Sequence, residues 1–585
     1  MVDISHSLVV TFDGRELDDI PVEAVVEQHV HLPSSFVVTY ADPDREFLGT
    51  SRLSIGGKVS IGVRGSQGNV EELVRGEITA LEADIHGGGS WTVVRGYDLA
   101  HRLQRRRRTK GFVNATYDSV VRTIAAEHGI ELGTVRPTRV VHGHIVQANE
   151  DDWTFVRRLA HEVGFDVGLA QGKLHFRPAT KAAAAPRPAQ RMDDEAIDGH
   201  ALVFGSNLVE LRAIVTSAGA APSVEVRGWD TASAKPIEER CADTRSAAVD
   251  NGVGPHDTDR FEVRTPATVA FLADMTSSRA KAAAAAVADR VGAAAAEFEG
   301  VARGNAALHA GAAVSVGLVG PPFDGRYVLT ATRHSFDPDD GYRTSFVVSA
   351  QPDTTLRGLG GAVAPTAEHG GLASAIVHAV ADPERLGRVQ LSFPWLDATY
   401  VSDWCRVAQP GAGRDRGFVI LPEVADEVLV GFEHGDFNRP YVISGLHNGQ
   451  AKAKVASGAL IDRTSGTVEQ RVFTSRRGHQ LVFRDDESSS GIELRTGDGA
   501  ATLVLDTKTS GITIKCQGTV TIDATKDVSI KAAKNVTIKA DGGALSLEGT
   551  TVSVKGQGSV KVSGVEVTVD GQGTTSIKGN PVKLN

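Results

Sequence analysis

The chain has 585 residues, of which 41% are hydrophobic and 23% charged, and its net charge is −10 at pH 7. Because a single hydrophobic core stops growing near ~250–300 residues, this length predicts several domains. The acidic balance gives no support for nucleic acid as a partner. Cys241, Cys405 and Cys516 are far apart, so they offer neither a disulfide framework nor a CxxC metal pair, as expected in a reducing cytoplasm.

The sequence also lacks the apolar segments that membranes and export require. No run approaches the ~20 apolar residues of a membrane-spanning helix. The N-terminus has neither the basic nor the apolar region of an export signal. We therefore expect a protein that is not integral to a membrane and is not exported through an N-terminal signal.

The spacing of apolar residues divides the first 200 residues into two parts, 1–100 and 101–200. Residues 1–100 alternate with a period of two, which predicts a small barrel or sandwich with strands at 7–12, 22–30, 35–40, 58–63, 77–82 and 91–95. Residues 101–200 contain two stretches of helical spacing, at 114–128 and 151–163, and read as an α/β insertion. Residues 179–200 are rich in alanine and proline and predict a linker or an exposed loop.

Residues 201–360 return to strand spacing. Strands are expected near 201–230 and at 312–319, 326–334 and 343–350. An alanine-rich helix is expected at 277–300. Glycines and a proline at 352–371 mark the clearest domain boundary.

Residues 372–450 form a compact β segment, a polar connector covers 451–480, and repeats fill 481–585. Two alternating runs in the compact segment would fill a small barrel: Val389, Leu391 and Phe393, and Val428, Val430 and Phe432.

Pairs of apolar residues recur every seven to nine residues in the C-terminal repeats. Each unit reads as one short strand followed by a polar turn. A strand that buries two side chains per unit cannot form a core alone, so such repeats must stack on copies of themselves. The predicted core positions of this needle are Val520, Ile522, Val528, Ile530, Val536, Ile538, Leu545, Leu547, Val552, Val554, Val560 and Val562.

Stacking of the repeats predicts a long, narrow rod that associates with copies of itself. A lone ladder would leave unpaired edges, whereas three intertwined chains remove the edges and bury the apolar pairs. Burial contributes roughly 1.5–3 kcal/mol per aliphatic side chain, which sums to ample stabilisation over many repeats. A generic β-solenoid module is the alternative to a piercing needle.

Residues 372–450 resemble the OB-fold of VgrG proteins, the spikes of type VI secretion and related contractile injection systems. Several motifs carry this resemblance in the expected order, among them Phe-Pro-Trp, Trp-Cys-Arg-Val and Gly-Asp. The signature positions are Phe393, Pro394, Trp395, Trp404, Arg406, Pro422, Asp426, Glu427, Gly435 and Asp436.

The first 360 residues are similar to the hub half of the same family, related to phage late-control protein D. The strongest match is the run from Gln147 to Trp153, and a second match is Tyr327–Thr330 with His334–Phe336. The resemblance implies a mainly β fold, with a tandem β-barrel hub, an α/β insertion, an OB-fold barrel and an intertwined triple-stranded β-helix or prism. It also implies a homotrimer whose hub meets a hexameric inner-tube protein and baseplate proteins.

Catalytic motifs are absent from the sequence: there is no G-x-S-x-G elbow, no HExxH helix and no Walker A loop. No catalytic residue, cofactor or metal site is therefore expected, and His142 and His144 are interpreted as a solvated pair. The basic run Arg105–Arg108 is expected in an exposed loop or facing an acidic partner. Trp395 and Trp404 are expected in barrel-core or trimer-interface packing.

The apex of the needle is expected to need a separate protein. The chain stops at Asn585, within one repeat of its last apolar pair, and no histidine follows His479 to form an apical metal site. The resemblance therefore implies a PAAR-type tip protein bound at the C-terminal apex.

These patterns favour a non-enzymatic homotrimeric spike that joins tube and hub and punctures a target membrane. It would be assembled in the cytoplasm of the producing cell and delivered on contraction. The alternatives are the spike scaffold of a secreted effector or cell-wall hydrolase, and a surface adhesin. The sequence does not separate a type VI spike from an extracellular or cytoplasmic phage-tail-like particle.

Overall fold

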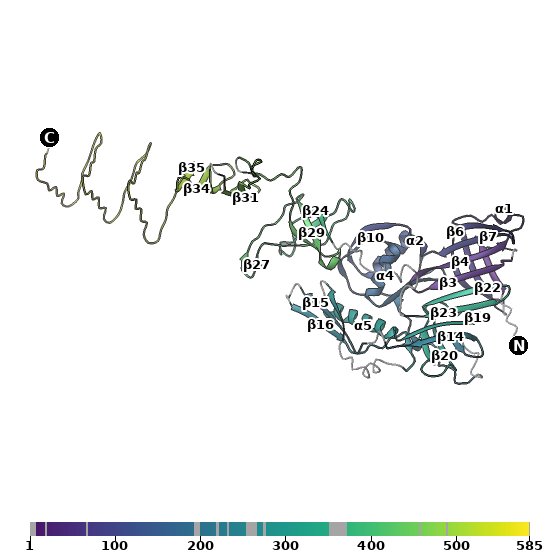
Figure 1. Cartoon of the computed structure of the whole chain (residues 1–585). Coiled ribbons are helices and arrows are strands. Elements are labelled where there is room, and N and C mark those ends of the chain that lie inside the picture. Colours follow the sequence, from purple (N-terminus) through teal and green to yellow (C-terminus); the bar gives the residue numbers. More distant parts are fainter. Residues whose placement is uncertain are drawn as a thin grey trace. The chain divides into compact units, whose positions relative to one another are not determined.

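The computed structural model divides into two compact units, Met1–Lys452 and Ala453–Asn585, each described by itself (Figure 1). The structure describes residues 7–17, 20–65, 68–191, 199–217, 221–230, 233, 235–252, 266–272, 277–349, 371–455, 458–486 and 489–583. The boundary predicted at 352–371 lies outside the described residues, apart from Gly371.

An eleven-stranded sheet in the first unit has the order β14-β19-β23-β22-β3-β4-β7-β6-β5-β1-β2 (Figure 1). The six strands predicted in residues 1–100 are confirmed. Strand β22 pairs with β3, with Ala331 opposite His29, so strands of both predicted barrels share one sheet. The strands are β1 (Ser7–Phe12), β2 (Arg15–Glu16), β3 (Glu23–His29), β4 (Leu32–Ala41), β5 (Lys58–Arg64), β6 (Val70–His86), β7 (Gly89–Asp98), β14 (Leu208–Val215), β19 (Ala296–Arg303), β22 (Ala331–Asp337) and β23 (Gly341–Val348).

Alternation places every second side chain of this sheet in a core. Phe36 and Tyr40 of β4 are buried in one cluster, and Phe298 of β19 and Phe346 of β23 are buried in another. At Gly96 an added Cβ would lie 2.2 Å from the Phe36 ring, so the aromatic ring occupies the space that glycine leaves.

The α/β insertion contains both helices that the sequence predicts. Helix α3 is capped by Thr116, whose side chain accepts a hydrogen bond from the Ser119 N–H in a capping box. Val121 of α3 and Phe155 of α4 pack in one core, together with strands on either side. The elements are α2 (His101–Gln104), β8 (Arg107–Ala115), α3 (Tyr117–Glu127), β9 (Glu131–Val135), β10 (His142–Asp151), α4 (Asp152–Glu162), β11 (Phe165–Ala170) and β12 (Lys173–Pro178).

Helix α5 packs on a small sheet of order β16-β15-β18, with Ala280, Ala284 and Ala288 against Val224 and Val226. A separate sheet has the order β13-β20-β21-β17. The remaining elements of the first 350 residues are α1 (Phe47–Ser51), β13 (Ala201–Val203), β15 (Val224–Asp230), β16 (Lys235–Cys241), β17 (Val249–Asp250), β18 (Ala267–Leu272), α5 (Ser277–Ala293), β20 (Ala313–Gly317) and β21 (Gly325–Val328).

Two expectations for this region are wrong. The alanine-rich helix ends at Ala293 instead of residue 300, because Ala296–Arg303 alternates buried and exposed positions and pairs as β19 between β14 and β23. Sheet pairing there overrides the helix propensity of alanine. The described part of 179–200 is not simply an exposed linker, because Ala182 and Ala185 are buried against strands β20 and β21.

The predicted OB barrel is a five-stranded sheet of order β25-β24-β29-β30-β26. Val389, Leu391 and Phe393 are fully buried, as the alternation predicts, and Val428 and Val430 face them in the same core. The elements are β24 (Leu372–Ala379), β25 (Gln390–Ser392), β26 (Arg406–Val407), the hairpin β27 (Ala412–Gly413) and β28 (Arg416–Gly417), β29 (Glu427–Phe432) and β30 (Pro440–Gly445).

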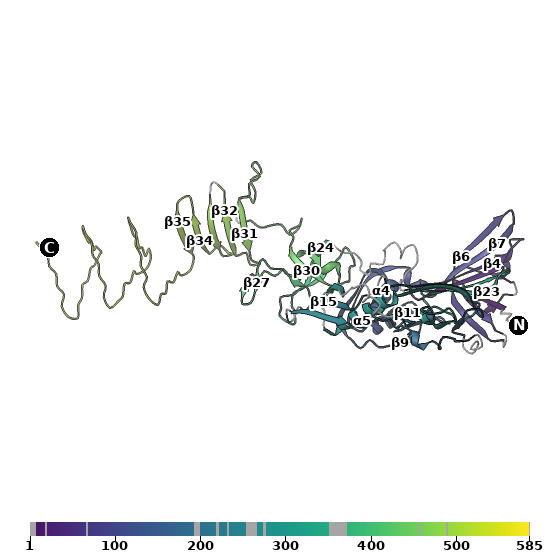
Figure 2. The ribbon, with the colours of Figure 1, turned by 60° about the horizontal axis from the view of Figure 1, so that its bottom comes forward.

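The second unit begins with an antiparallel meander that starts earlier than expected. Strand β31 and the first residue of β32 fall within the predicted connector, because residues 470–480 already alternate and pair with each other. The five strands are β31 (Gln470–Thr474), β32 (Gln480–Arg484), β33 (Gly491–Arg495), β34 (Ala501–Asp506) and β35 (Gly511–Cys516) (Figure 2).

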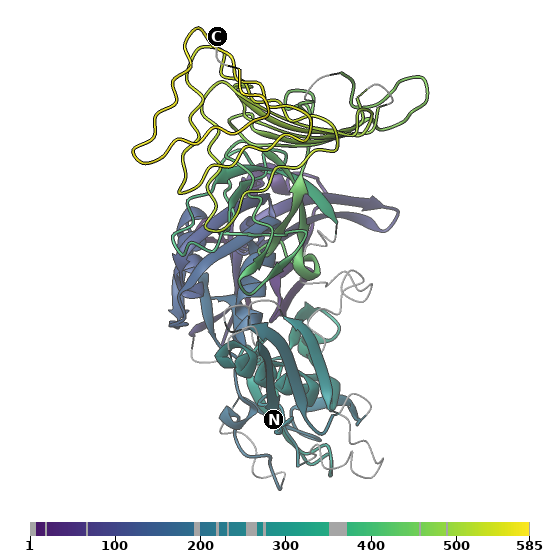
Figure 3. The same ribbon diagram turned by 90° about the vertical axis from the view of Figure 1, so that its left-hand side faces the viewer.

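Beyond β35 the chain winds onward without strands, which differs from the expectation of one short strand per repeat. Residues 517–583 contain no helix or strand, and Figure 3 shows successive turns of this segment as open loops. A strand needs a neighbour to complete its ladder, and these repeats find none among the described residues of their own chain. None of the helices in the described ranges is long and apolar enough to span a membrane.

Candidate functional site

One face of the β31–β35 meander is apolar and uncovered within the chain. The register aligns Leu481, Leu494, Leu503 and Ile514 across neighbouring strands. Positions two residues away carry a second apolar row that includes Ile492 and Leu505. The exposed fractions of the large side chains on this face run from 37% to 72% among Phe473, Phe483, Ile492, Leu494, Leu505, Ile512 and Ile514.

The winding segment after β35 exposes all twelve predicted core positions of the needle. Their exposed fractions lie between 54% and 73%. The structure thus brings none of these pairs into a core within the described chain. Contiguous exposed apolar surface on a soluble protein marks an interaction site.

The OB signature residues divide into core, turn and surface positions. Phe393 is fully buried, whereas Trp395 is 56% exposed and its indole N–H donates to the Ser374 carbonyl at 2.7 Å. Trp404 is half-buried. Core packing of Trp395 within one chain is therefore wrong, because its ring stays mostly outside while its polar edge is tied to β24.

Polar signature residues shape turns around the OB barrel. The Asp426 carboxylate accepts from the Glu423 N–H at 2.8 Å, directly after Pro422. Glu427 accepts from the Asn448 side chain at 2.7 Å. Arg406 lies over the Tyr441 ring, 5.7 Å from its centroid.

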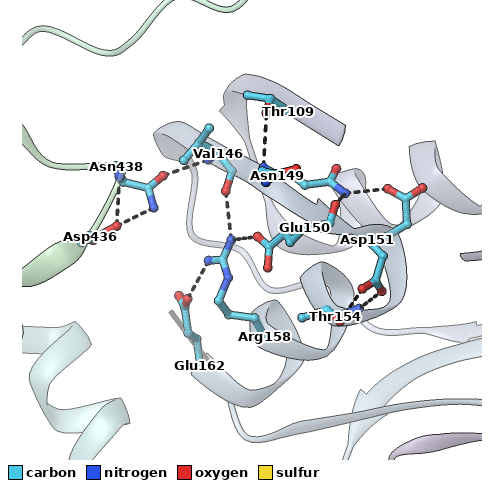
Figure 4. Close-up of polar contacts among 12 residues, drawn as sticks. Thr109, Val146, Asn149, Glu150, Asp151, Thr154, Arg158, Glu162, Asp436 and Asn438 are labelled. Atoms are coloured by element: carbon cyan, nitrogen blue, oxygen red, sulfur yellow. Dashed lines mark hydrogen bonds and ion pairs between the residues drawn. The ribbon is translucent and has the colours of Figure 1, made fainter. Parts of the chain in front are cut away.

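Gly435 and Asp436 form the turn that presents Asn438. Gly435 adopts a φ of 78°, which glycine tolerates without strain. The Asp436 carboxylate accepts from both the backbone N–H and the side-chain amide of Asn438, at 2.9 and 2.8 Å. The Asn438 carbonyl oxygen is thereby aimed at strand β10, where it accepts from the Val146 N–H at 2.9 Å (Figure 4).

This contact joins the OB barrel to the α/β insertion, and we call it the barrel–insertion joint. It comprises Asp436 and Asn438 on the barrel side, and Val146, Ala148 and Arg158 on the insertion side. Val146 and Ala148 are buried in the same cluster as the barrel residues. The joint therefore combines an apolar core with directed hydrogen bonds.

Arg158 is the charged centre of the joint (Figure 4). Its guanidinium donates to the Val146 carbonyl at 2.9 Å and to Glu150 at 2.6 Å, and it pairs with Glu162 at 3.4 Å. Burial opposes its charge, but the carboxylates of Glu150 and Glu162, with Asp436, raise the pKa of Arg158. A buried cation held in this way is a structural ion pair.

The run from Gln147 to Trp153 is explained by contacts within the fold. Gln147 and Asp152 are both buried, and Asp152 accepts from Gln147, Arg108 and His128. The Trp153 indole N–H donates to the His31 carbonyl at 3.2 Å and so ties the helix to the loop between β3 and β4.

The basic run is split between two environments. Arg105, Arg106 and Arg107 are exposed, as expected. Arg108 is not, because it pairs with Glu127 and Asp152 of the same unit, at 2.6 and 2.7 Å. The acidic partners of Arg108, the last arginine of the run, therefore come from the same chain.

The histidine pair is packed instead of simply solvated. His142 stacks on Tyr117 with ring centroids 4.3 Å apart. His144 lies beside Tyr400 of the OB barrel, with the two rings tilted and their centroids 6.0 Å apart. Burial lowers the pKa of His144. Among the described residues, no group of three His, Cys, Asp or Glu side chains is placed to hold a metal ion.

The run Gln147–Trp153 and Asp436 could both be singled out from the sequence, but the contact between these two segments was not predicted. Asn438 and Val146 lie 292 residues apart, so no local pattern pairs them. The alternation of Ile145, Val146 and Ala148 was the available signal that β10 has two apolar faces.

Comparison with known proteins defines the class. A family model described as the type VI secretion system/phage-baseplate injector OB domain matches residues 373–447. The type VI secretion system spike protein VgrG2a of Pseudomonas aeruginosa is 28% identical over 124 residues, which are 20% of this chain and 14% of that protein. VgrG3 of Vibrio cholerae is 31% identical over 116 residues, 19% of this chain and 11% of the relative. The resemblance to VgrG-like spike proteins is thus confirmed.

A second family model, for the Alg8 N-terminal domain, matches residues 37–337, more than half of the chain. The chain belongs to the family that this model describes. A solved structure of the Francisella PdpA–VgrG complex, half-lidded, shares the fold with a TM-score of 0.52, 9% identity and 88% coverage of each chain. The matches to the two curated relatives span less than a sixth of the length of either.

Proposed function

We propose that this protein is the homotrimeric central spike of a phage-tail-like contractile injection system and that it acts mechanically, without catalysis. The observation that carries the proposal is the row of apolar pairs in residues 517–583, exposed in every repeat. Their even spacing suits a partner with the same repeat, which is a second copy of the chain.

Three intertwined copies would satisfy both requirements of this segment. Each chain would supply the ladder neighbour that the others lack, so backbone N–H and C=O groups would be paired without free edges. The apolar pairs would point inward, and exposed lysines such as Lys526 and Lys531 would keep the outside soluble. A rod closed in this way resists bending and can transmit thrust.

The other partners follow from the same proposal. The spike would seat on a hexameric inner tube and baseplate proteins through its first unit, and would carry a PAAR-type tip protein at the C-terminal apex. Assembly would occur in the cytoplasm of the producing cell, and the spike would meet a target membrane on contraction.

A paired substitution tests the inward-facing assignment. Val536→Asp together with Ile538→Asp places six carboxylates of a trimer in a dry core, which costs several kcal/mol without compensation. We expect the variant to lose any SDS-resistant trimer on a gel run without heating. The matched control is Asn535→Asp with Thr537→Asp, which adds the same charge at the alternate, outward positions and keeps the trimer. Persistence of a resistant trimer in the Val536 and Ile538 variant contradicts the assignment.

A further inference from the structure

Strand β10 contributes side chains to two hydrophobic cores. Ile145 lies in the core of the α/β insertion, with Phe155 and Val156. Val146 and Ala148, on the opposite face, lie in the core of the OB barrel and are 1% and 6% exposed. A period of two along the strand makes this possible, since successive side chains point to opposite faces.

Polar contacts fix the position of the barrel on this strand. The Val146 N–H donates to Asn438 across the joint, and its carbonyl accepts from Arg158 within the insertion, so both backbone groups of this residue are satisfied (Figure 4). Beside them, an added Cβ at Gly111 of β8 would lie 3.5 Å from the Tyr400 ring, so the barrel approaches the backbone closely. Such a surface fixes orientation as well as distance.

We propose that the face of β10 carrying Val146 and Ala148 is the docking surface of the OB barrel, and that thrust passes between insertion and barrel across it. The thrust rests on the proposed function, whereas the docking rests on the contacts alone. A covalent connection limits only the separation of its two ends. A close-packed interface has low compressibility and transmits force directly.

Cleavage of the covalent connection tests the docking. A site for a sequence-specific protease is inserted between Gly360 and Gly361 of the full chain, and cleavage is followed on a denaturing gel. We expect fragments 1–360 and 361–585 to elute together in native buffer after cleavage. If the protease does not cut the inserted site, residues 1–360 and 361–585 are co-expressed as separate chains. Co-elution of the two chains then supports the docking, and separate elution of two folded chains contradicts it. Separate elution of two folded fragments overturns the proposal.

A charge on the docking face supplies the matched variant. Ala148→Glu buries a carboxylate in the barrel core only while the barrel is docked, so we expect the cleaved fragments to separate. Ile85→Glu, at a 58% exposed position of strand β6 outside the joint, is the control and leaves them together. If Ala148→Glu does not fold, Asn438→Ala replaces it, and we expect roughly fivefold or greater weakening of fragment association.

The native mass of the cleaved protein distinguishes a failure of the docking proposal from a failure of the proposed trimer. Fragments that co-elute as one copy of each support the docking and contradict the trimer. Fragments that separate from a chain that was trimeric before cleavage contradict the docking and support the trimer.

Discussion

Asp152 is the first residue of helix α4 and Arg158 lies near its middle, and both connect the helix to its surroundings by charge. Asp152 accepts from Arg108 and His128 near the N-terminal end, where a negative charge also complements the helix dipole. Arg158 faces the barrel and binds Val146 and Glu150. Each buried charge has a partner of opposite sign, so these two side chains serve to position the elements around helix α4.

His334 gives a pH prediction at the residue scale. Its ring is fully buried, with Nδ1 3.0 Å from the Tyr342 hydroxyl, and burial lowers the pKa of His334 to about 4. The unfolded residue titrates near ~6.5, so the unfolded state binds the extra proton between these values. The stability contribution is present above that range and is lost as pH falls through it.

We expect His334→Gln, which cannot titrate, to remove this loss. Between pH 7 and 5 the free energy of unfolding of the unsubstituted chain should fall by about 2 kcal/mol more than that of the variant. Guanidinium denaturation followed by tryptophan fluorescence measures both. Equal losses in the two proteins would show that His334 keeps a normal pKa.

At the scale of elements, helix α4 depends on its N-cap. The Asp151 carboxylate accepts from the Thr154 N–H at 2.8 Å and from its hydroxyl at 2.9 Å. Asp151→Ala should lower the free energy of unfolding by about 1 kcal/mol, because one of the first-turn donors loses its acceptor. Asp151→Asn retains an acceptor and should lose much less. Equal stability of the alanine and asparagine variants in denaturant titrations would refute the capping role.

Elements with a clear local period could be predicted, and elements decided by distant contacts could not. Strands such as β4 and β23 alternate strictly, and α3 and α4 carry caps at their first turn. The C-terminal end of helix α5 could not be predicted from the sequence. Alanine suits a helix, but it also suits the buried face of strand β19, where Ala296 lies. The barrel–insertion joint was also missed, since its two halves are distant in sequence and each reads as an ordinary strand or turn.

For the whole molecule, the apolar repeats give the strongest link between sequence and assembly. The period-two pairs were recognisable from sequence, and the structure leaves all of them exposed together with one face of the β31–β35 meander. Extensive unburied aliphatic surface of this kind is unfavourable for an isolated chain in water. In the proposed trimer, association of identical repeats would remove that surface and would also pair the backbone.

Cys516 offers a chemical readout of this association. It follows Ile512 and Ile514 on the same face of β35 and is half-buried in one chain. In a trimer with that face inward, we expect Cys516 to react with iodoacetamide at least tenfold more slowly than in the Val536→Asp, Ile538→Asp variant. Site-resolved mass spectrometry after timed alkylation measures the rates, and equal rates would place this face outside the assembly.

The number of chains in the native particle tests the central claim most directly. Native mass spectrometry of the full-length protein at micromolar concentration should give a single species of three times the 61.6 kDa chain mass. A stable species with the mass of one chain under the same conditions would contradict the trimeric spike.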